Sequence, residues 1–350
     1  MSIKADSAAD AFKQKRALGE QMFSDIGLVI IGRNEGERLH VCLRSIVGRV
    51  AHIIYVDSDS TDGSVAFARS LGIDVVELDM SVPFTAARAR NAGFERLDQI
   101  APKLEFVQFV DGDCEVVDGW LESAFKTFAK RQDVAVICGR VRERFREASL
   151  YNRLCDDLDW DLPPGEVTSC GGNAIMRVDA FRQVGCFDPL LIAGEEPELC
   201  VRLRSKGWKI LRVPVEMVLH DAALVSFGQW WKRMVRSGHS YAEGMYLHGN
   251  SPQRHFVRQT FRTVFWAALI PLLAIAPLYA TGGWSLMLLV AYPIQWVRVA
   301  INQRRAGRSW VNAGVYSLFL LIIKFSELAG MVIFWFNLLR RRKTRLMEYQ

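Results

Sequence analysis

Two carboxylates in Asp111-Gly112-Asp113 are the residues of this 350-residue chain that most directly suggest chemistry. They stand one residue apart after the apolar run at residues 106–110, so a buried strand would deliver both to one turn. Mg²⁺ and Mn²⁺ take oxygen ligands and keep positions open for substrate phosphates. The same tripeptide also occurs in ordinary surface turns for backbone reasons. The surroundings therefore decide between a metal site and a simple turn.

Two further polar groups also follow apolar runs, one after residues 27–32 and one after residues 52–56. The residues of these groups are Arg33, Asn34, Glu35, Asp57 and Asp59. In a sheet of parallel strands, ligands bind beyond the carboxyl ends of the strands. We therefore expect these groups and the Asp111 turn to open on the same edge of a sheet.

The elements that must position these groups alternate along the first 225 residues. Apolar runs predict strands over residues 27–32, 52–56, 73–78, 106–110 and 134–138. Helical spacing and capping residues predict helices over residues 37–46, 61–71, 86–97 and 118–130. Repeated strand-helix-strand units predict an α/β fold with a mostly parallel, Rossmann-like sheet and helices on both faces.

Six motifs, taken in order, resemble the family 2 glycosyltransferases, which have the GT-A fold. They are Ile30-Ile-Gly-Arg-Asn-Glu35, Val56-Asp57 with Ser60-Thr-Asp-Gly-Ser64, Ala87-Arg-Ala-Arg-Asn-Ala-Gly93, Val110-Asp-Gly-Asp113, Gly171-Gly-Asn-Ala174, and Gly194-Glu-Glu-Pro-Glu-Leu199 followed by Arg202-Leu-Arg and Gly207-Trp208. The resemblance runs from about Gly27 to His220, and it implies transfer of a sugar from a nucleotide-diphosphate donor.

The resemblance also implies a role for each matching residue. The nucleotide-sugar would be bound by Arg33, Asn34, Glu35, Asp57, Asp59, Arg90, Asn91, Asp111, Gly172 and Asn173. Mn²⁺ or Mg²⁺ would be held by Asp113, with Asp111 acting on the ribose or on the metal through water. His220 is a candidate third ligand, because neutral imidazole binds transition metals.

Glu195 and Glu196 open a predicted helix and are the candidate catalytic bases. Inverting transfer needs one carboxylate to accept the acceptor's hydroxyl proton, and a cation to neutralise the leaving diphosphate. The family usually has Glu-Asp where this chain has Glu195-Glu196, which leaves open which of the two is the base. Ser58 also stands where the family often has a second Asp, so base recognition can shift to Asp57 or Asp59.

Charge and cysteine content indicate the cellular compartment and the kind of partner. The formal net charge is +6, and many basic residues flank the apolar C-terminal part rather than forming a stripe across the first part. This pattern favours anionic lipid headgroups over nucleic acid as the partner. The seven cysteines form no CxxC pair, and residues 1–20 show no apolar signal core. Together they predict a catalytic part that stays in the reducing cytosol.

The last third of the chain predicts membrane helices. Residues 264–280 and 284–300 are apolar segments of nearly spanning length, joined by a turn at residues 281–283. Residues 311–339 form a third apolar stretch, in which Lys324 and Glu327 are spaced to pair on one helix face. Basic loops usually lie on the cytosolic side of a membrane. If all the basic loops of this chain do so, the third stretch must re-enter the membrane, lie in the interface or cross twice. A single crossing would break this rule at one end.

We therefore divide the chain into five regions. They are an N-terminal extension (1–24), a GT-A domain (25–225), amphipathic interface helices (226–262), membrane helices (263–340) and a basic cytosolic tail (341–350). The predicted location is the inner (cytoplasmic) membrane with the catalytic domain facing the cytosol, and an oligomer is compatible with this arrangement.

The favoured function is an inverting glycosyltransferase that moves a sugar, preferably from a UDP-sugar, to a membrane-associated, lipid-linked acceptor in polysaccharide or glycolipid assembly. One alternative is a nucleotidyltransferase, although Gly32-Arg-Asn-Glu-Gly36 makes a poor phosphate loop. The other is a non-enzymatic membrane scaffold with a degenerate transferase domain. Release of free nucleoside diphosphate, rather than pyrophosphate, would exclude the nucleotidyltransferase. Failure to bind nucleotide and metal would favour the scaffold.

Overall fold

A computed structural model describes residues 23–160 and 162–340. They fall into two compact units that divide between Val225 and Ser226. The predicted N-terminal extension lies outside the described residues up to residue 22, and so does the predicted basic tail over residues 341–350.

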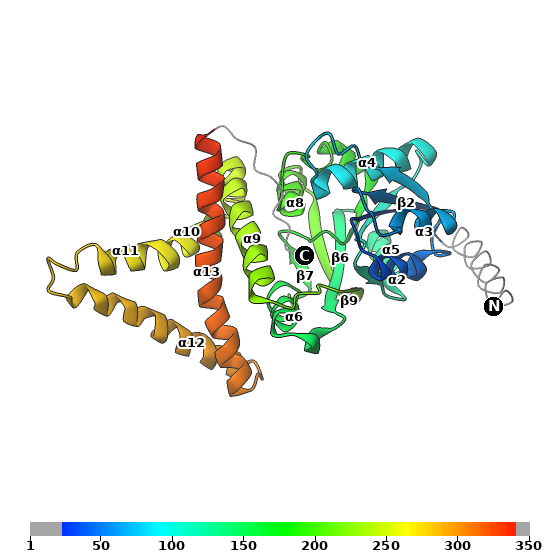
Figure 1. Cartoon of the computed structure of the whole chain (residues 1–350). Helices are drawn as coiled ribbons and strands as arrows, with labels where there is room; N and C mark the ends of the chain where they lie inside the picture. Colours follow the sequence, from blue (N-terminus) through cyan, green and yellow to red (C-terminus); the bar gives the residue numbers. More distant parts are fainter. Residues whose placement is uncertain (1–22, 161, 341–350) are drawn as a thin grey trace. The chain divides into compact units, whose positions relative to one another are not determined.

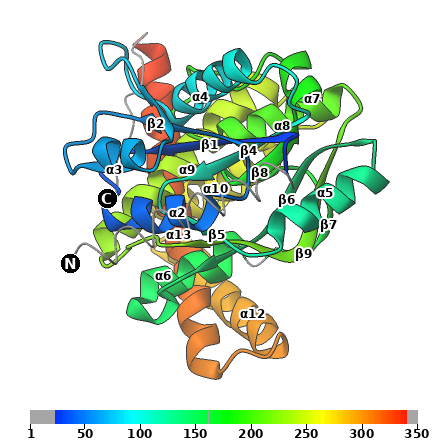
Figure 2. The same cartoon turned by 90° about the vertical axis from the view of Figure 1, so that its right-hand side faces the viewer.

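The first unit is built on one mixed sheet, to which the described residues contribute nine strands in the order β3-β2-β1-β4-β8-β6-β9-β5, with β7 beside β9. Figure 2 shows β2, β1, β4 and β8 following one another across it. The strands are β1 (Ile26–Gly32), β2 (His52–Asp57), β3 (Asp74–Glu77), β4 (Phe106–Asp111), β5 (Cys114–Val116), β6 (Val134–Glu143), β7 (Gly165–Val167), β8 (Ala174–Arg177) and β9 (Lys209–His220). The helices are α2 (Glu37–Ile46), α3 (Ser64–Ser70), α4 (Ala86–Ile100), α5 (Trp120–Lys130), α6 (Leu150–Cys155), α7 (Val178–Gln183) and α8 (Glu195–Ser205), with short turns η1 (Arg146–Ala148) and η2 (Asp156–Trp160).

Strands β3, β2, β1 and β4 run parallel, as the alternation of strands and helices predicts. Their register pairs Gly32 with Asp57 and Ile31 with Asp111, so the carboxyl ends of β1, β2 and β4 reach the same edge. The three polar groups that follow these strands are therefore neighbours in space.

The rest of the sheet is less parallel than the sequence pattern suggested. Strand β8 is antiparallel to β4 and β6, and β5 and β7 are antiparallel to β9, while β6 and β9 are parallel. Only Gly112 and Asp113 separate β4 from β5, and β5 pairs with β9 instead of β4. The alternation of one strand with one helix is therefore interrupted at this turn.

Helix α4 packs closely on the sheet at Gly93. A β-carbon at this position would lie 2.3 Å from Val29 Cγ1 and 2.8 Å from Val56 Cγ2. Arg90 stands three residues earlier, on the same helix face. Because α4 packs this closely at Gly93, the Arg90 side chain lies at the edge of the sheet where the parallel strands end.

Two helices begin two or three residues later than their sequence pattern suggests. Helix α3 starts at Ser64 and α5 at Trp120, where helices from residues 61 and 118 are expected. The residue before each start, Gly63 or Gly119, has a φ of 86° or 81°. This left-handed conformation suits glycine and lies outside the helical region, so each helix begins after it.

The second unit is a set of helices: α9 (Phe227–His248), α10 (Val257–Val264), η3 (Phe265–Leu269), α11 (Ile270–Ile275), η4 (Trp284–Val290), α12 (Ala291–Arg305) and α13 (Trp310–Leu339). Figure 1 shows α9 running alongside α13. Glycines permit this contact, because a β-carbon at Gly238 would lie 1.9 Å from Glu327 O, and one at Gly330 would lie 1.9 Å from Val235 O. The two helix backbones thus touch, as in small-residue helix pairs.

Within the described residues, two helical segments are long and apolar enough to cross a membrane, Trp284–Arg305 and Trp310–Leu339. The predicted segment at residues 264–280 is helical only as far as Ile275, and it is not among the segments that meet this test. The expected Lys324–Glu327 pair is confirmed, with Lys324 Nζ 2.9 Å from Glu327 Oε1. Thr263 of α10 also donates to this carboxylate.

Candidate active site

A buried arginine gathers three of the predicted site carboxylates. Arg90 Nη1 lies 2.8 Å from Glu195 Oε1 and 2.9 Å from Glu196 Oε1, and Arg90 Nη2 lies 2.8 Å from Asp111 Oδ1. The arginine side chain is only 3% exposed. Helix α4, the end of β4 and the first turn of α8 therefore converge on one point. This geometry makes Arg90 a residue that holds the carboxylates together, in addition to the donor contact that the resemblance implies.

Glu196 is the more accessible of the two candidate bases. Its side chain is 13% exposed, against 4% for Glu195. Burial and the negative charge of Glu195 together raise the pKa of Glu196 to about 7, against the opposing effect of Arg90. A carboxyl group with a pKa near 7 is suited to accept a proton at neutral pH.

Gly172 lies directly against this cluster. A β-carbon there would lie 2.3 Å from Arg90 Nη2, 2.7 Å from Asp111 Oδ2 and 3.1 Å from Glu196 Oε1. The preceding glycine differs, since a β-carbon at Gly171 would have nothing within 4 Å. Gly172 therefore lets the backbone reach the carboxylates, which explains the need for glycine at this position.

This contrast gives a matched pair of variants. We expect Gly172→Ala to destabilise the protein by about 1–3 kcal/mol through overpacking and to displace the Arg90 side chain. Gly171→Ala adds the same methyl group into open space and should leave stability nearly unchanged. The midpoint of thermal unfolding measures both, and an equal loss in the two variants would contradict the packing described for Gly172.

Asn173 links this cluster to the second half of the site. Its Oδ1 accepts from Asp111 N at 3.1 Å, and its Nδ2 donates to Asp111 Oδ2 at 3.3 Å and to Cys114 Sγ at 3.4 Å. Cys114 follows Asp113 directly. Asn173, which the resemblance places among the nucleotide-sugar-binding residues, thus fixes the Asp111-Gly112-Asp113 turn from both ends.

Asp113, Cys114 and His220 form a candidate metal centre, with one potential ligand atom of each within 4.8 Å of the others. His220 Nε2 lies 3.3 Å from Asp113 Oδ2. Strand pairing explains this, because β9 places His220 opposite Cys114 of β5. A carboxylate, an imidazole and a thiol fit a first-row transition ion better than Mg²⁺, which prefers oxygen ligands.

Glu35 joins the two halves from the loop after β1. Burial and the charge of Asp113 together raise the pKa of its carboxyl group to about 7, against the opposing effect of Arg38. Arg38 Nη2 lies 2.8 Å from Glu35 Oε2. A β-carbon at Gly112 would lie 3.1 Å from Glu35 Cγ, so the turn between the two aspartates needs glycine to pass this side chain.

The loops after β1 and β2 are bonded to each other. Asn34 Oδ1 accepts from Thr61 N at 2.8 Å, and Ser60 Oγ accepts from Asn34 N at 2.9 Å. Asp62 Oδ2 also accepts from Gly36 N at 2.7 Å. These bonds fix the shape of the loop that carries Arg33, which is half-buried beside them.

Asp57 is buried at the end of β2, with one partner on each oxygen. Tyr55 Oη donates to Oδ1 at 2.9 Å, and Ser60 N donates to Oδ2 at 2.8 Å. Each carboxylate oxygen can accept a second bond. The two donors thus orient the carboxylate, which keeps further acceptor capacity.

Two predicted residues are placed differently from the others. Asn91 bonds the backbone of Phe187 at both ends of its amide, from Nδ2 to Phe187 O at 2.8 Å and from Phe187 N to Oδ1 at 3.1 Å. It therefore anchors the segment before α8. Asp59 is exposed in the loop after β2, with a φ of 70°.

Sequence reasoning missed three residues of the site: Cys114, Glu143 and Trp160. Glu143 Oε2 lies 3.7 Å from His220 Nδ1, and the Trp160 ring centre lies 4.6 Å from that of His220. Strand β6 was expected to end at residue 138, but it continues to Glu143. The charged run that follows residue 138 looks like a surface loop, so the sequence carried no signal for a buried glutamate.

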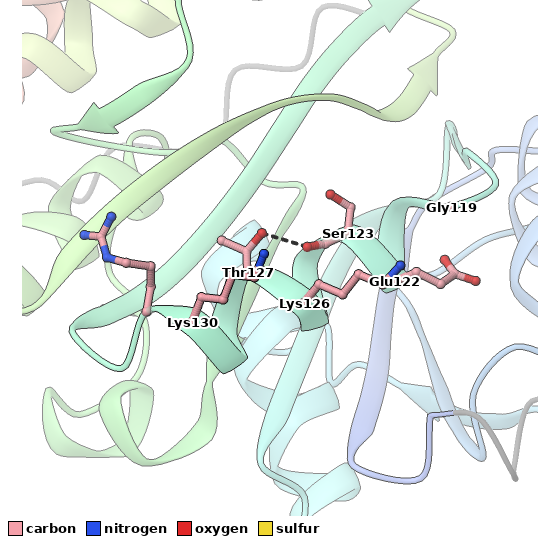
Figure 3. A pocket seen from close by; sticks show the side chains of 7 residues that line it. Gly119, Glu122, Ser123, Lys126, Thr127 and Lys130 are labelled. Carbon is pink, nitrogen blue, oxygen red and sulfur yellow. Dashed lines mark hydrogen bonds between the residues drawn. The ribbon is translucent and has the colours of Figure 1, made fainter.

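A hollow on α5 contains none of the predicted site residues. Figure 3 shows Gly119, Glu122, Ser123, Lys126, Thr127 and Lys130 lining it. Thr127 Oγ1 donates to Ser123 O at 2.7 Å, a bond within the helix. The hollow lies on the surface of one helix and is lined by a single acidic residue, Glu122. It lacks the set of carboxylates found at the strand ends.

Comparisons with known proteins give a family match over part of the chain. Residues 28–185 match the model of glycosyl transferase family 2. A pre-mycofactocin glycosyltransferase of Mycobacterium tuberculosis is 31% identical over 212 residues, which is 56% of this chain and 43% of that protein. The chain thus spans less than half the length of this relative. The glycosyltransferase AglE of Haloferax volcanii is 23% identical over 254 residues, which is 69% of this chain and 79% of AglE.

One solved structure resembles nearly the whole chain. The mannosyltransferase PcManGT from Pyrobaculum calidifontis, in complex with GDP-Man and Mn²⁺, has a TM-score of 0.57 at 14% identity and covers 95% of this chain and 99% of its own. This likeness shows the fold. The mixed sheet with its strand-end carboxylates defines a GT-A domain. The match of residues 28–185 to the family 2 glycosyltransferase model agrees with the resemblance drawn from the sequence, and the predicted GT-A fold is confirmed.

Proposed function

We propose that this protein is an inverting, Mn²⁺-dependent glycosyltransferase that moves a sugar from a nucleotide-diphosphate donor to a membrane-associated, lipid-linked acceptor. The observation that carries the proposal is the convergence on Arg90 of Asp111, Glu195 and Glu196, with Asp113 and His220 linked to them through Asn173 and Cys114. The proposed proton acceptor and the proposed cation-binding residues thus belong to one connected set of side chains.

The proposed reaction is a direct displacement at the anomeric carbon. The acceptor oxygen forms a bond to this carbon while the bond to the diphosphate oxygen breaks, and the hydroxyl proton passes to Glu196 Oε. Bound Mn²⁺ would neutralise charge on the leaving diphosphate, and Asp113 and His220 would hold it. Arg90 keeps the Glu196 carboxylate oriented, and Asp57 and Arg33 line the proposed base pocket.

Two features of the chain support its association with a membrane, and a membrane-bound enzyme favours a membrane-associated acceptor. The segments Trp284–Arg305 and Trp310–Leu339 meet the length and hydropathy of membrane spans, and Arg304, Arg305 and Arg308 stand in or beside the loop between them. Basic loops mark the cytosolic side. We propose the inner membrane as the location, with the transferase domain in the cytosol.

The full-length chain in detergent or native membranes provides the test. Thermal unfolding is followed with UDP, GDP and TDP, each with Mn²⁺ or Mg²⁺, since a ligand stabilises the state that binds it. The corresponding nucleotide-sugars are then incubated with a lipid extract. Release of the nucleoside diphosphate with a glycosylated lipid supports the proposal. Pyrophosphate release would indicate a nucleotidyltransferase, and the absence of any stabilisation would favour a scaffold.

The raised pKa of Glu196 predicts a pH dependence. The base must be ionised, so the rate of transfer should rise with pH, with a midpoint near 7, and level off above it. Because the charge of Glu195 raises this pKa, Glu195→Gln should move the midpoint to lower pH. Initial rates from pH 5 to 9 measure both profiles. A flat wild-type profile would contradict Glu196 as the base.

A further inference from the structure

His220 lies between two carboxylates, one just before β5 and the other at the end of β6. Strand β9 is flanked by β5 and β6, and its last residue pairs with Cys114 on one side and with Glu143 on the other. His220 Nε2 lies 3.3 Å from Asp113 Oδ2, and Nδ1 lies 3.7 Å from Glu143 Oε2. Each ring nitrogen thus faces its own acid.

The two acids differ in what surrounds them. The Asp113 side chain is 11% exposed, whereas that of Glu143 is fully buried. Glu143 Oε1 accepts from Phe145 N at 3.1 Å and from Asn152 Nδ2 at 3.2 Å, and its Oε2 accepts from Ala222 N at 3.1 Å. Three donors therefore fix the Glu143 carboxylate, and one of them comes from the residue two positions after His220.

The Trp160 ring also packs against the imidazole in a tilted contact, at 4.6 Å between ring centres and 52° between ring planes. Histidines that bind metals usually give their other ring N–H to a carboxylate or carbonyl, which sets the tautomer and the direction of the free lone pair. A fixed, buried acceptor beside Nδ1 favours the tautomer with hydrogen on Nδ1. The lone pair of Nε2 then points to the side of Asp113.

We infer that Glu143 is a positioning residue of the metal centre: it holds His220 so that Nε2 faces a divalent cation beside Asp113. The inference rests on the metal site of the proposed function. It assigns a purpose to a buried acid that lies 30 residues beyond the Asp111-Gly112-Asp113 turn in the chain.

Glu143→Gln is the informative variant. Glutamine keeps the volume, but an amide N–H₂ replaces one acceptor. If the amide N–H₂ faces Nδ1 of His220, it would donate a hydrogen bond to Nδ1. The ring hydrogen would then be on Nε2, where it prevents that nitrogen from binding the cation. We expect Mn²⁺ affinity to fall about 10- to 100-fold, as for other partners of metal-ligating histidines. Mn²⁺ titration of the full-length chain without any sugar donor, followed by electron paramagnetic resonance of free Mn²⁺, measures it.

Asp156→Asn is the matched structural control. This buried acid accepts from Glu143 N at 2.9 Å and from Arg146 Nε at 2.9 Å, so its replacement disturbs the same segment. It should leave Mn²⁺ affinity within about threefold of wild type, an allowance set by the context dependence of single interactions. An equal loss of affinity in both variants would overturn the inference, because the effect would then belong to the fold of the segment.

Asp113→Asn and His220→Ala separate this inference from the proposed function. If both weaken Mn²⁺ binding while Glu143→Gln binds as wild type does, the positioning role is refuted and the metal site stands. If neither weakens binding, the proposed metal site itself is wrong. Weakened binding in Asp113→Asn, His220→Ala and Glu143→Gln, but not in Asp156→Asn, is the expected result.

Discussion

Glu196→Gln is expected to lower the rate of sugar transfer by about 100- to 10,000-fold, the usual contribution of a positioned general base. Glutamine cannot take up the acceptor proton. It can still accept the bond from Arg90 Nη1, which lies 2.9 Å from Glu196 Oε1, so the cluster should keep its shape. Nucleotide and Mn²⁺ binding should therefore stay near the wild-type level while turnover is lost.

Two comparisons make this experiment decisive. Glu37→Gln changes a first-turn acid of α2 whose side chain is 73% exposed, and it should leave the rate unchanged. Glu195→Gln should retain measurable turnover with a shifted pH profile. If Glu195→Gln instead abolishes transfer while Glu196→Gln remains active, Glu195 is the base.

Arg90→Met should produce the largest loss of stability. Removing one partner of a buried ion pair costs about 3–5 kcal/mol, because the remaining charges are left uncompensated. Here a single guanidinium faces Asp111, Glu195 and Glu196, so methionine would leave three carboxylates next to one another. We expect a marked fall in the midpoint of thermal unfolding and loss of transfer.

The surface pair of Arg69 and Glu77 gives the control. Their side chains are 56% and 63% exposed, and such pairs contribute within about 1 kcal/mol, so Arg69→Met should change stability little. Arg90→Lys keeps the charge but lacks the planar fork, and it should recover part of the stability. Equal stability of Arg90→Met and wild type would refute the central role given to this arginine.

The sequence alone predicted which residues stand at the ends of the strands. Apolar runs at β1, β2 and β4, each followed by polar residues, place Arg33, Asp57 and Asp111 at one edge, because parallel strands align their carboxyl ends. Local spacing was also sufficient for the Lys324–Glu327 pair, whose members are three residues apart on one helix.

The tertiary structure alone decided what these residues contact. Arg90 and Glu195 are 105 positions apart, and their contact depends on how α4 and α8 pack on the sheet. The approach of His220 to Asp113 depends on the antiparallel pairing of β5 with β9, and the position of Glu143 depends on the register of β6 with β9. Periodicity shows which face of an element is buried, but it carries no information on which distant element covers that face. The partners of Arg90, His220 and Glu143 are therefore products of long-range packing and strand register.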